Sequence, residues 1–235
     1  MKYRMKKRMA DKACMLLSWC ADLLFPPRCV FCGEIVPPGE KVCRRCTSEI
    51  LPSGEVFCVS VPVGNTQILC TYLFPYEGKV RDSILNFKFH GQKRNALYYA
   101  EKLAAQSAVA FPRLKFDAVT CVPLTRDREH ERGYNQSELI ARPLAEALEI
   151  PFFPCLKKTG ENKVQHFLNR EERLRNVHGI YALSEKNDIS GKKILLVDDI
   201  LTTGSTMGEC AFVLLQGGAA SVRGAVIAKA GLESG

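Results

Sequence analysis

Most of the chain has the apolar pattern of alternating strands and helices. Uninterrupted apolar runs predict buried strands, and apolar residues recurring every three to four positions predict the helices that cover them. The expected strands are residues 68–74, 117–122, 152–156, 179–183, 193–197 and 221–228, and the expected helices are residues 79–88, 96–109, 136–149 and 205–216. This alternation indicates an α/β fold whose mostly parallel sheet has helices on both faces.

The first 67 residues follow a different pattern. Residues 11–25 have apolar positions at helical spacing and stop at Pro26-Pro27, which cannot continue a helix. A cysteine-rich stretch follows, and residues 47–67 are turn-rich and weakly periodic, as is typical of a linker. We therefore predict a basic head with an amphipathic helix over residues 1–24, a cysteine module over 25–60 and an α/β domain over 68–235.

Composition indicates an ordinary globular protein. The 235 residues are 46% hydrophobic and 25% charged, which excludes a disordered, collagen-like or coiled-coil chain. No apolar run reaches the length of about 18 residues that spans a bilayer, and the basic start lacks the cleavage site of a signal peptide. With an odd number of cysteines, 11, and no secretion signal, we expect the chain in the reducing cytoplasm.

The net charge of +8 is concentrated in two segments. The first 12 residues hold six basic side chains and one acidic side chain, and residues 157–175 hold six basic and three acidic ones. Both segments are either solvated surface or sites that attract a polyanion such as single-stranded DNA.

Four cysteines form two pairs with two-residue spacing: Cys29, Cys32, Cys43 and Cys46. Each pair places two thiolates on one tight turn, so that four sulfurs can surround one zinc ion at about 2.3 Å. A redox pair or two disulfides are the alternatives, which a duplicated pair in a cytoplasmic chain makes weaker. Four sulfur ligands leave no open position for water or substrate, so we expect the zinc to be structural.

The most informative segment is residues 193–206. An apolar strand leads into Asp198 and Asp199, then into small hydroxyl residues around Gly204, and then into a helix. Hydroxyls and the N–H groups at a helix N-terminus bind phosphate, and glycine lets the backbone approach closely. The carboxylates would repel a phosphate unless they contact sugar hydroxyls or act through magnesium. The segment therefore predicts a ligand that is both a phosphate and a polyol, with an exposed acidic turn as the alternative.

This segment resembles the binding motif for phosphoribosyl pyrophosphate (PRPP) of type I phosphoribosyltransferases. In that family two acids hold the ribose 2′ and 3′ hydroxyls and the following loop holds the 5′-phosphate. The resemblance implies Mg²⁺ as a cofactor and Asp198 and Asp199 as catalytic, ribose-binding residues. It also implies a set of 5′-phosphate ligands: Thr202, Thr203, Gly204, Ser205 and Thr206.

Further motifs resemble the ComF family in sequence and order. They are the cysteine pairs, residues 76–81, 87–89, 122–124, 131–136 and 173–177, and Gln165. Members are bacterial and associated with competence for DNA uptake. The resemblance implies a type I phosphoribosyltransferase-like domain over residues 68–235 behind a zinc ribbon. Longer members carry a second ribbon, whereas this chain keeps only Cys58 and Cys70 there, so we predict one zinc.

The resemblance also assigns residues outside the acidic motif to the ligand. Pro123 and Leu124 follow an early strand, at the place where family members contact the pyrophosphate. Arg132, Asn135 and Gln136 are implied to lie near the ligand, where an arginine would give a diphosphate bidentate contacts. Lys88 and His90 could also reach an anion.

Three functions are compatible with these patterns. A protein that binds PRPP and magnesium and acts in bacterial competence agrees best with the resemblance. A non-catalytic nucleotide sensor, which binds single-stranded DNA or a partner from the uptake machinery, is the second. A nucleotide-salvage phosphoribosyltransferase is the third. No residue stands out as a general base, so the sequence leaves open whether the chain is an enzyme.

Overall fold

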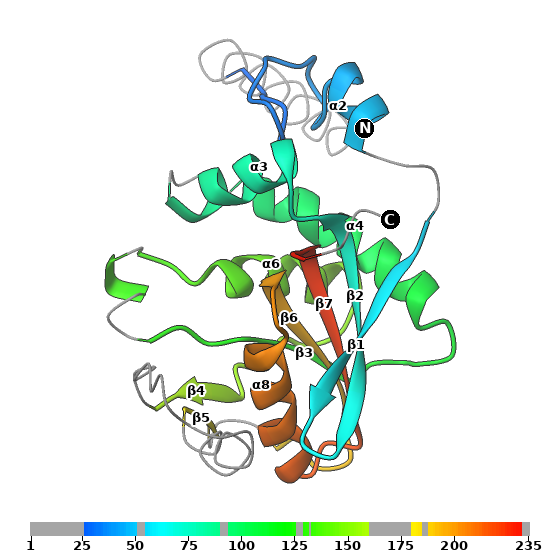
Figure 1. Cartoon of the computed structure of the whole chain (residues 1–235), viewed down its shortest axis with the longest axis vertical. Coiled ribbons are helices and arrows are strands. Elements are labelled where there is room, and N and C mark those ends of the chain that lie inside the picture. Colours follow the sequence, from blue (N-terminus) through cyan, green and yellow to red (C-terminus); the bar gives the residue numbers. More distant parts are fainter. Residues whose placement is uncertain are drawn as a thin grey trace, which may run out of the picture. The chain divides into compact units, whose positions relative to one another are not determined.

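The computed structural model describes residues 26–50, 55–89, 94–125, 129–131, 133–159, 180–184 and 188–231. The chain divides into two compact units, Met1–Ser53 and Gly54–Gly235, and each is described by itself. Figure 1 colours the elements along the sequence. The basic head and the helix predicted over residues 11–25 lie outside the described residues.

The first unit is built on a cysteine turn and one short helix. The Cys29 N–H donates to the carbonyl of Glu34 at 2.7 Å, and the Gly33 N–H donates to the carbonyl of Cys29 at 3.0 Å. Helix α2 (Arg44–Ile50) buries only Cys46. Among residues 26–50, the described part of the unit, few apolar residues are buried: Cys29, Val30, Phe31, Val36 and Cys46. Such a small core rarely folds without a metal or a disulfide.

The second unit contains a five-stranded sheet with the order β1-β2-β7-β6-β3. Its strands are β1 (Phe57–Val63), β2 (Thr66–Pro75), β3 (Ala118–Cys121), β6 (Lys193–Leu201) and β7 (Ser221–Lys229). β2, β7, β6 and β3 run parallel, and β1 pairs antiparallel with β2. The predicted α/β fold with a mostly parallel sheet is confirmed.

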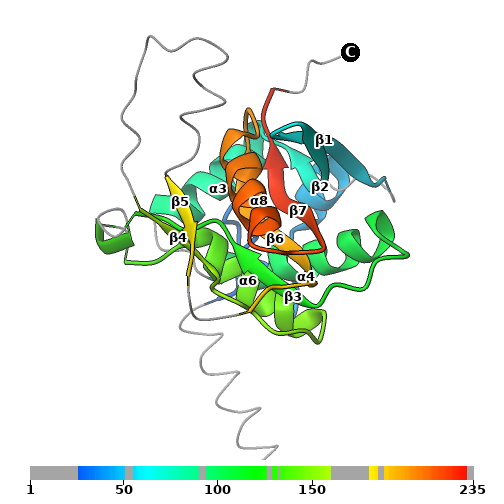
Figure 2. The same cartoon turned by 90° about the horizontal axis from the view of Figure 1, so that it is seen from below.

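Helices cover both faces of this sheet, as predicted. Helix α8 (Ser205–Gln216) packs on one face, and α4 (Asn95–Ala110) and α6 (Gln136–Ala147) pack on the other (Figures 1 and 2). Helix α3 (Gly78–Phe89) follows β2. The covering helices bury the positions that recur at helical spacing, such as Met207, Cys210 and Leu214 in α8. This burial is what the apolar periodicity predicted.

The linker predicted over residues 47–67 contains β1. Two residues, Gly64 and Asn65, connect β1 to β2, and Val63 pairs with Thr66. The division between the two compact units, after Ser53, falls within this predicted linker. The periodicity of β1 was weak because its outer face is exposed and Pro62 lies within it.

The strand predicted over residues 152–156 is wrong in its bounds. Phe152 forms only an isolated bridge with Val119, because Pro151 and Pro154 on either side lack the N–H that a ladder needs. The strand in this region is β4 (Leu156–Lys158), which pairs with β5 (Tyr181–Leu183) in a small second sheet.

β1 and the start of α8 are in close contact. A Cβ atom on Gly208 would overlap the carbonyl oxygen of Pro62, and one on Gly204 would lie 3.1 Å from Cγ1 of Val61. Only glycine allows a helix to approach a strand backbone this closely. The strand missing from the sequence prediction thus positions the loop that precedes α8.

Gly208→Ala tests this contact. Alanine in a helix interior normally stabilises by about 1 kcal/mol relative to glycine. Here we expect a loss of about 1–3 kcal/mol, because the added methyl group overlaps the Pro62 carbonyl. Urea unfolding measures the difference, with Ala105→Gly at an exposed position of α4 as the calibration of helix propensity. A more stable Gly208→Ala protein would contradict the placement of β1.

Candidate functional site

The residues predicted to bind the ligand gather where two neighbouring strands lead to opposite faces of the sheet. β3 is followed by α6 on one face, and β6 is followed by α8 on the other. The Val122 N–H donates to the carbonyl of Val197 at 3.0 Å, so the turn after β3 lies beside Asp198. Parallel α/β sheets bind their ligands at such a point.

The residues predicted to bind the 5′-phosphate form the loop before α8 and the first turn of α8. Thr202, Thr203, Ser205 and Thr206 are exposed, whereas Gly204 is buried and has a φ angle of +81°. Oγ1 of Thr203 accepts from the Ser205 N–H at 3.4 Å and lies 3.0 Å from the Ser205 hydroxyl. Exposed hydroxyls at the N-terminus of a 12-residue helix can bind an anion.

Asp198 and Asp199 lie near the end of β6 and have different partners. The Ser137 hydroxyl, at the start of α6, donates to Oδ1 of Asp198 at 2.8 Å, and the Asp199 N–H donates to the same oxygen at 2.9 Å. Asp199 forms an ion pair with Lys88, whose Nζ lies 2.8 Å from Oδ2. One carboxylate is thus held by neutral donors and the other by a cation.

Burial and the neighbouring carboxylate change the pKa of Asp198. Burial and the charge of Asp199 raise the pKa of Asp198 from 3.8 to about 7, and the donors from Ser137 and Asp199 and the charge of Lys88 offset this only in part. Because the folded protein binds this proton more tightly than the unfolded chain does, protonation of Asp198 stabilises the fold. This contribution is complete below the pKa of Asp198 in the unfolded chain, 3.8, and is lost as the pH rises through about 7. A ligand that brings positive charge or hydroxyl donors to these oxygens would remove the repulsion.

Asn135 and Gln136, which we predicted to lie near the ligand, support the site through hydrogen bonds. The Asn135 side chain caps α6 by accepting from the Ser137 N–H at 3.0 Å, and it donates to the carbonyl of Val122 at 3.0 Å. The Gln136 amide donates to the carbonyl of Lys88 at 3.4 Å. Both residues are buried, so they connect the start of α6 to the turn after β3 and to the end of α3.

The remaining predicted residues are only partly described. Pro123 and Leu124 are half-buried in the turn after β3, beside the acidic pair. Arg132 and His90 lie outside the described residues. Their assignment to the ligand remains a prediction.

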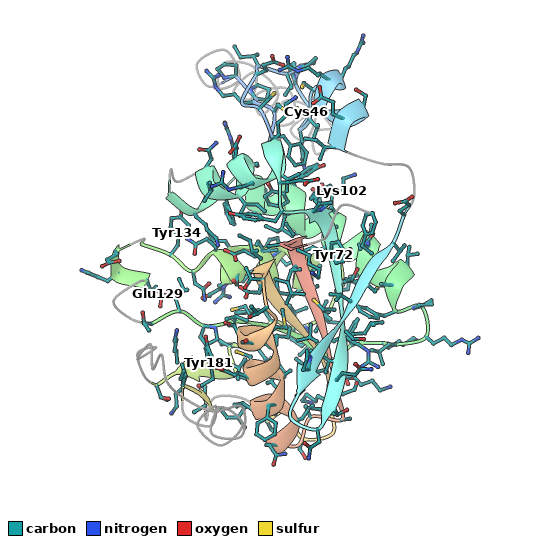
Figure 3. All side chains as sticks on the ribbon, viewed as in Figure 1. Cys46, Tyr72, Lys102, Glu129, Tyr134 and Tyr181 are labelled. Atoms are coloured by element: carbon teal, nitrogen blue, oxygen red, sulfur yellow. The ribbon has the colours of Figure 1, made fainter. Side chains whose placement is uncertain are left out.

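Sequence reasoning missed two side chains that contact the predicted site residues. Ser137 holds Asp198, and Tyr181 in β5 makes a hydrogen bond with Thr206. Burial raises the pKa of Tyr181 above its ordinary value, and the hydrogen bond with Thr206 opposes this rise only in part. Figure 3 shows Tyr181 beside α8. The only signal for Ser137 was its place directly after the motif over residues 131–136.

The four cysteines of the first unit form one cluster. The sulfurs of Cys29, Cys32, Cys43 and Cys46 all lie within 4.8 Å of one another. Burial raises the pKa of Cys29, but backbone hydrogen bonds from Cys32, Cys43 and Phe31 lower it to about 7. Burial and the neighbouring thiols raise the pKa of Cys46. Four thiolates this close together repel one another unless a cation lies between them. Four sulfur donors in this arrangement fit a tetrahedral zinc ion.

Cys58 and Cys70 cannot form a second zinc site together. They are offset by one position in the β1–β2 ladder, where Cys58 pairs with Thr71 and Cys70 pairs with Val59, so their side chains point to opposite faces. Cys58 is exposed and Cys70 is fully buried. In the described ranges, the cluster of four cysteines is the one group of three or more His, Cys, Asp or Glu side chains close enough together to hold a metal ion.

Comparisons with known proteins agree with both units. The phosphoribosyl transferase domain model matches residues 135–233, and the double zinc ribbon domain model matches residues 20–71. DNA utilization protein YhgH of Escherichia coli (strain K12) is 29% identical, over 83% of this chain and 87% of that protein. Competence protein ComFC of Bacillus subtilis (strain 168) is 29% identical, over 80% of this chain and 83% of that protein. The chain belongs to the ComF family.

The fold of this ComF-family chain has the two parts that the matching domain models describe. A zinc ribbon module with four cysteines precedes a domain of the type I phosphoribosyltransferase kind. Among solved structures, an adenine phosphoribosyltransferase is similar at 19% identity and a TM-score of 0.42, over 75% of this chain and 85% of that chain. Within the described ranges, each helix is too short or too polar to cross a bilayer.

We expect one zinc ion per chain in the purified protein. Cys46→Ser should lose it, because three sulfurs and a hydroxyl bind zinc much more weakly, and the first unit should then unfold. Metal analysis and limited proteolysis of the full chain measure both effects. Cys58→Ser is the matched control and should retain one zinc ion. Two zinc ions per chain, or a loss of zinc in Cys58→Ser, would contradict the assignment.

Proposed function

We propose that this ComF-family protein binds PRPP with Mg²⁺ at the carboxyl ends of β3 and β6. One observation carries the proposal: Asp198 and Asp199 lie beside an exposed, hydroxyl-rich helix N-terminus at the point where the crossovers change face. A ribose 5-phosphate group offers hydroxyls to the carboxylates and an anion to the loop. The arrangement of these groups supports the ligand chemistry that we inferred from the sequence.

The residues present fit a magnesium ion as well. Carboxylate oxygens are the ligands that Mg²⁺ prefers, and the ion usually binds through one or two of them and a phosphate. When bound, it would neutralise the charge that the diphosphate and the carboxylates share. The chain's own residues would orient the ribose through Asp198 and Asp199 and bind its 5′-phosphate through residues 202–206.

The reaction that suits such a complex is a displacement at C1 of the ribose. An acceptor nucleophile would form a bond to C1 while the bond from C1 to the diphosphate oxygen breaks, and pyrophosphate would leave with the electron pair. The protein's contribution would be positioning and electrostatic stabilisation. Pro123 and Leu124, in the turn beside Asp198, would lie next to the leaving diphosphate.

We further propose that the protein acts in DNA uptake or utilisation in the bacterial cytoplasm. The names of its relatives, a competence protein and a DNA utilization protein, support this role. Four thiolates around a zinc ion require reduced cysteines, which suits the cytoplasm. The basic head, with six Lys and Arg among its first 12 residues, is the segment we propose for contact with single-stranded DNA.

Titration calorimetry with PRPP and Mg²⁺ tests the ligand. Asp198→Asn together with Asp199→Asn should weaken binding by about 100-fold or more, because two charge-assisted contacts are lost. Since the pKa of Asp198 is about 7, wild-type affinity should be about tenfold higher at pH 8 than at pH 6. Asp188→Asn, at an exposed acid, is the control. Equal binding by the wild type and the double variant would reject the site.

Fluorescence anisotropy with single-stranded DNA tests the second proposal. Affinity should fall steeply with salt, with a slope of about 0.7 for each phosphate contact. Changing the six basic residues of the head to Gln should flatten that slope: Lys2, Arg4, Lys6, Lys7, Arg8 and Lys12. Changing the exposed Lys102 and Lys115 in the same way is the control and should leave it unchanged. Binding that is insensitive to salt would argue against a role of the head.

A further inference from the structure

Among the described residues, Lys88 is the cation that pairs with the acidic motif. Its Nζ lies 2.8 Å from Oδ2 of Asp199, and the two side chains are only 17% and 12% exposed. An ion pair with so little access to water cannot open unless each charge finds a new partner, because an unpaired buried charge is strongly destabilising. Lys88 therefore neutralises Asp199 as long as no ligand is present.

The end of α3 that carries Lys88 is tied to the start of α6 and to Tyr134 just before it. The Tyr134 hydroxyl donates to the carbonyl of Phe87 at 2.7 Å, and the Gln136 amide donates to the carbonyl of Lys88 at 3.4 Å. Figure 3 shows Tyr134 on the side where α3 ends. The backbone of Lys88 is thus held in place, so a ligand that takes over Asp199 leaves the ammonium group within the site.

The turn after β3 belongs to the same hydrogen-bonded network. Asn135 donates to the carbonyl of Val122, immediately before Pro123 and Leu124, and Ser137 donates to Asp198. The start of α6 and its N-cap residue Asn135 therefore connect Lys88, the acidic pair and the turn assigned to the diphosphate. A diphosphate bound at that turn would offer a displaced Lys88 ammonium an anionic partner.

We propose that Lys88 selects for a sugar phosphate that carries a second, polyanionic group. The inference rests on the proposed function, and the second anionic group is what distinguishes PRPP from other ribose phosphates. A ribose hydroxyl that takes the place of Lys88 at Oδ2 of Asp199 displaces its ammonium. A diphosphate at C1 offers that ammonium a new partner, whereas ribose 5-phosphate leaves it unpaired. The ion pair seen without ligand thus opposes ribose 5-phosphate more than PRPP.

Lys88→Met tests the selection, because methionine keeps much of the side-chain length and removes the charge. Affinity for ribose 5-phosphate should rise about tenfold, since no ion pair has to open, and affinity for PRPP should fall about tenfold. The preference for PRPP would then drop about 100-fold. Calorimetry on the full chain with each ligand, at one Mg²⁺ concentration and pH 8, measures the ratio.

Two controls separate selection from folding. Lys88→Arg keeps the charge and should keep most of the preference for PRPP. Lys102→Met makes the same change at an exposed lysine of α4, whose Nζ lies 5.8 Å from the ring centroid of Tyr98, and should bind like the wild type. If Lys88→Met does not fold, Lys88→Gln replaces it, with the same expected change in ratio.

The outcomes distinguish this inference from the function on which it rests. If wild type and Lys88→Met bind both ligands with the same ratio, or the folded variant loses both ligands, Lys88 is not the selecting group and the PRPP site stands. If neither ligand binds the wild type or Lys102→Met, the proposed function is wrong and the inference falls with it.

Discussion

The structure of the site depends on one constraint, which is that two adjacent carboxylates lie near the end of a buried strand. Residues 194–197 of β6 are fully buried, and alternation along the strand directs Asp198 and Asp199 to opposite faces of the sheet. Each carboxylate therefore needs its own partner: the Ser137 hydroxyl for Asp198 and the Lys88 ammonium for Asp199. These partners fix the start of α6 and the end of α3 around the carboxyl edge of β6. Since Asp198 still has a raised pKa, the two carboxylates repel each other, and a suitable ligand would relieve this repulsion.

A second group of contacts places the loop beside the acids. Gly204 and Gly208 lie against Val61 and Pro62 of β1, so the first turn of α8 cannot move toward the sheet edge without a clash. On its other side, Tyr181 of β5 interacts with Thr206. The hydroxyl-rich turn is thus held between an edge strand and the small second sheet. Such support from both sides gives exposed hydroxyls a fixed geometry, which an anion site needs.

Sequence patterns predicted the covered parts of the fold well, because burial on a sheet imposes periodicity. Helix α8 has the predicted bounds, Ser205–Gln216, since Met207, Cys210 and Leu214 recur on one face. Strand β1 was missed because half of it is exposed, and the strand predicted over residues 152–156 was misplaced because prolines interrupt its ladder. In the site, the acidic motif was recognisable because its residues are contiguous. Ser137 and the ion pair between Lys88 and Asp199 depend on tertiary contacts between distant segments, which periodicity does not encode.

The double zinc ribbon match extends from the first unit into strand β2 of the second unit. The two parts of the matched region have different roles. The match covers residues 20–71, but only its first half has four sulfurs in one cluster. Its second half is the hairpin of β1 and β2, where Cys70 fills a space over Gly224 in which a Cβ atom would lie 2.7 Å from its sulfur. Cys70 is therefore a packing residue, and burial raises its pKa further from the thiolate form that zinc requires. In this chain the second half of the ribbon region supports the candidate site, because the same hairpin carries Val61 and Pro62 to the turn that precedes α8.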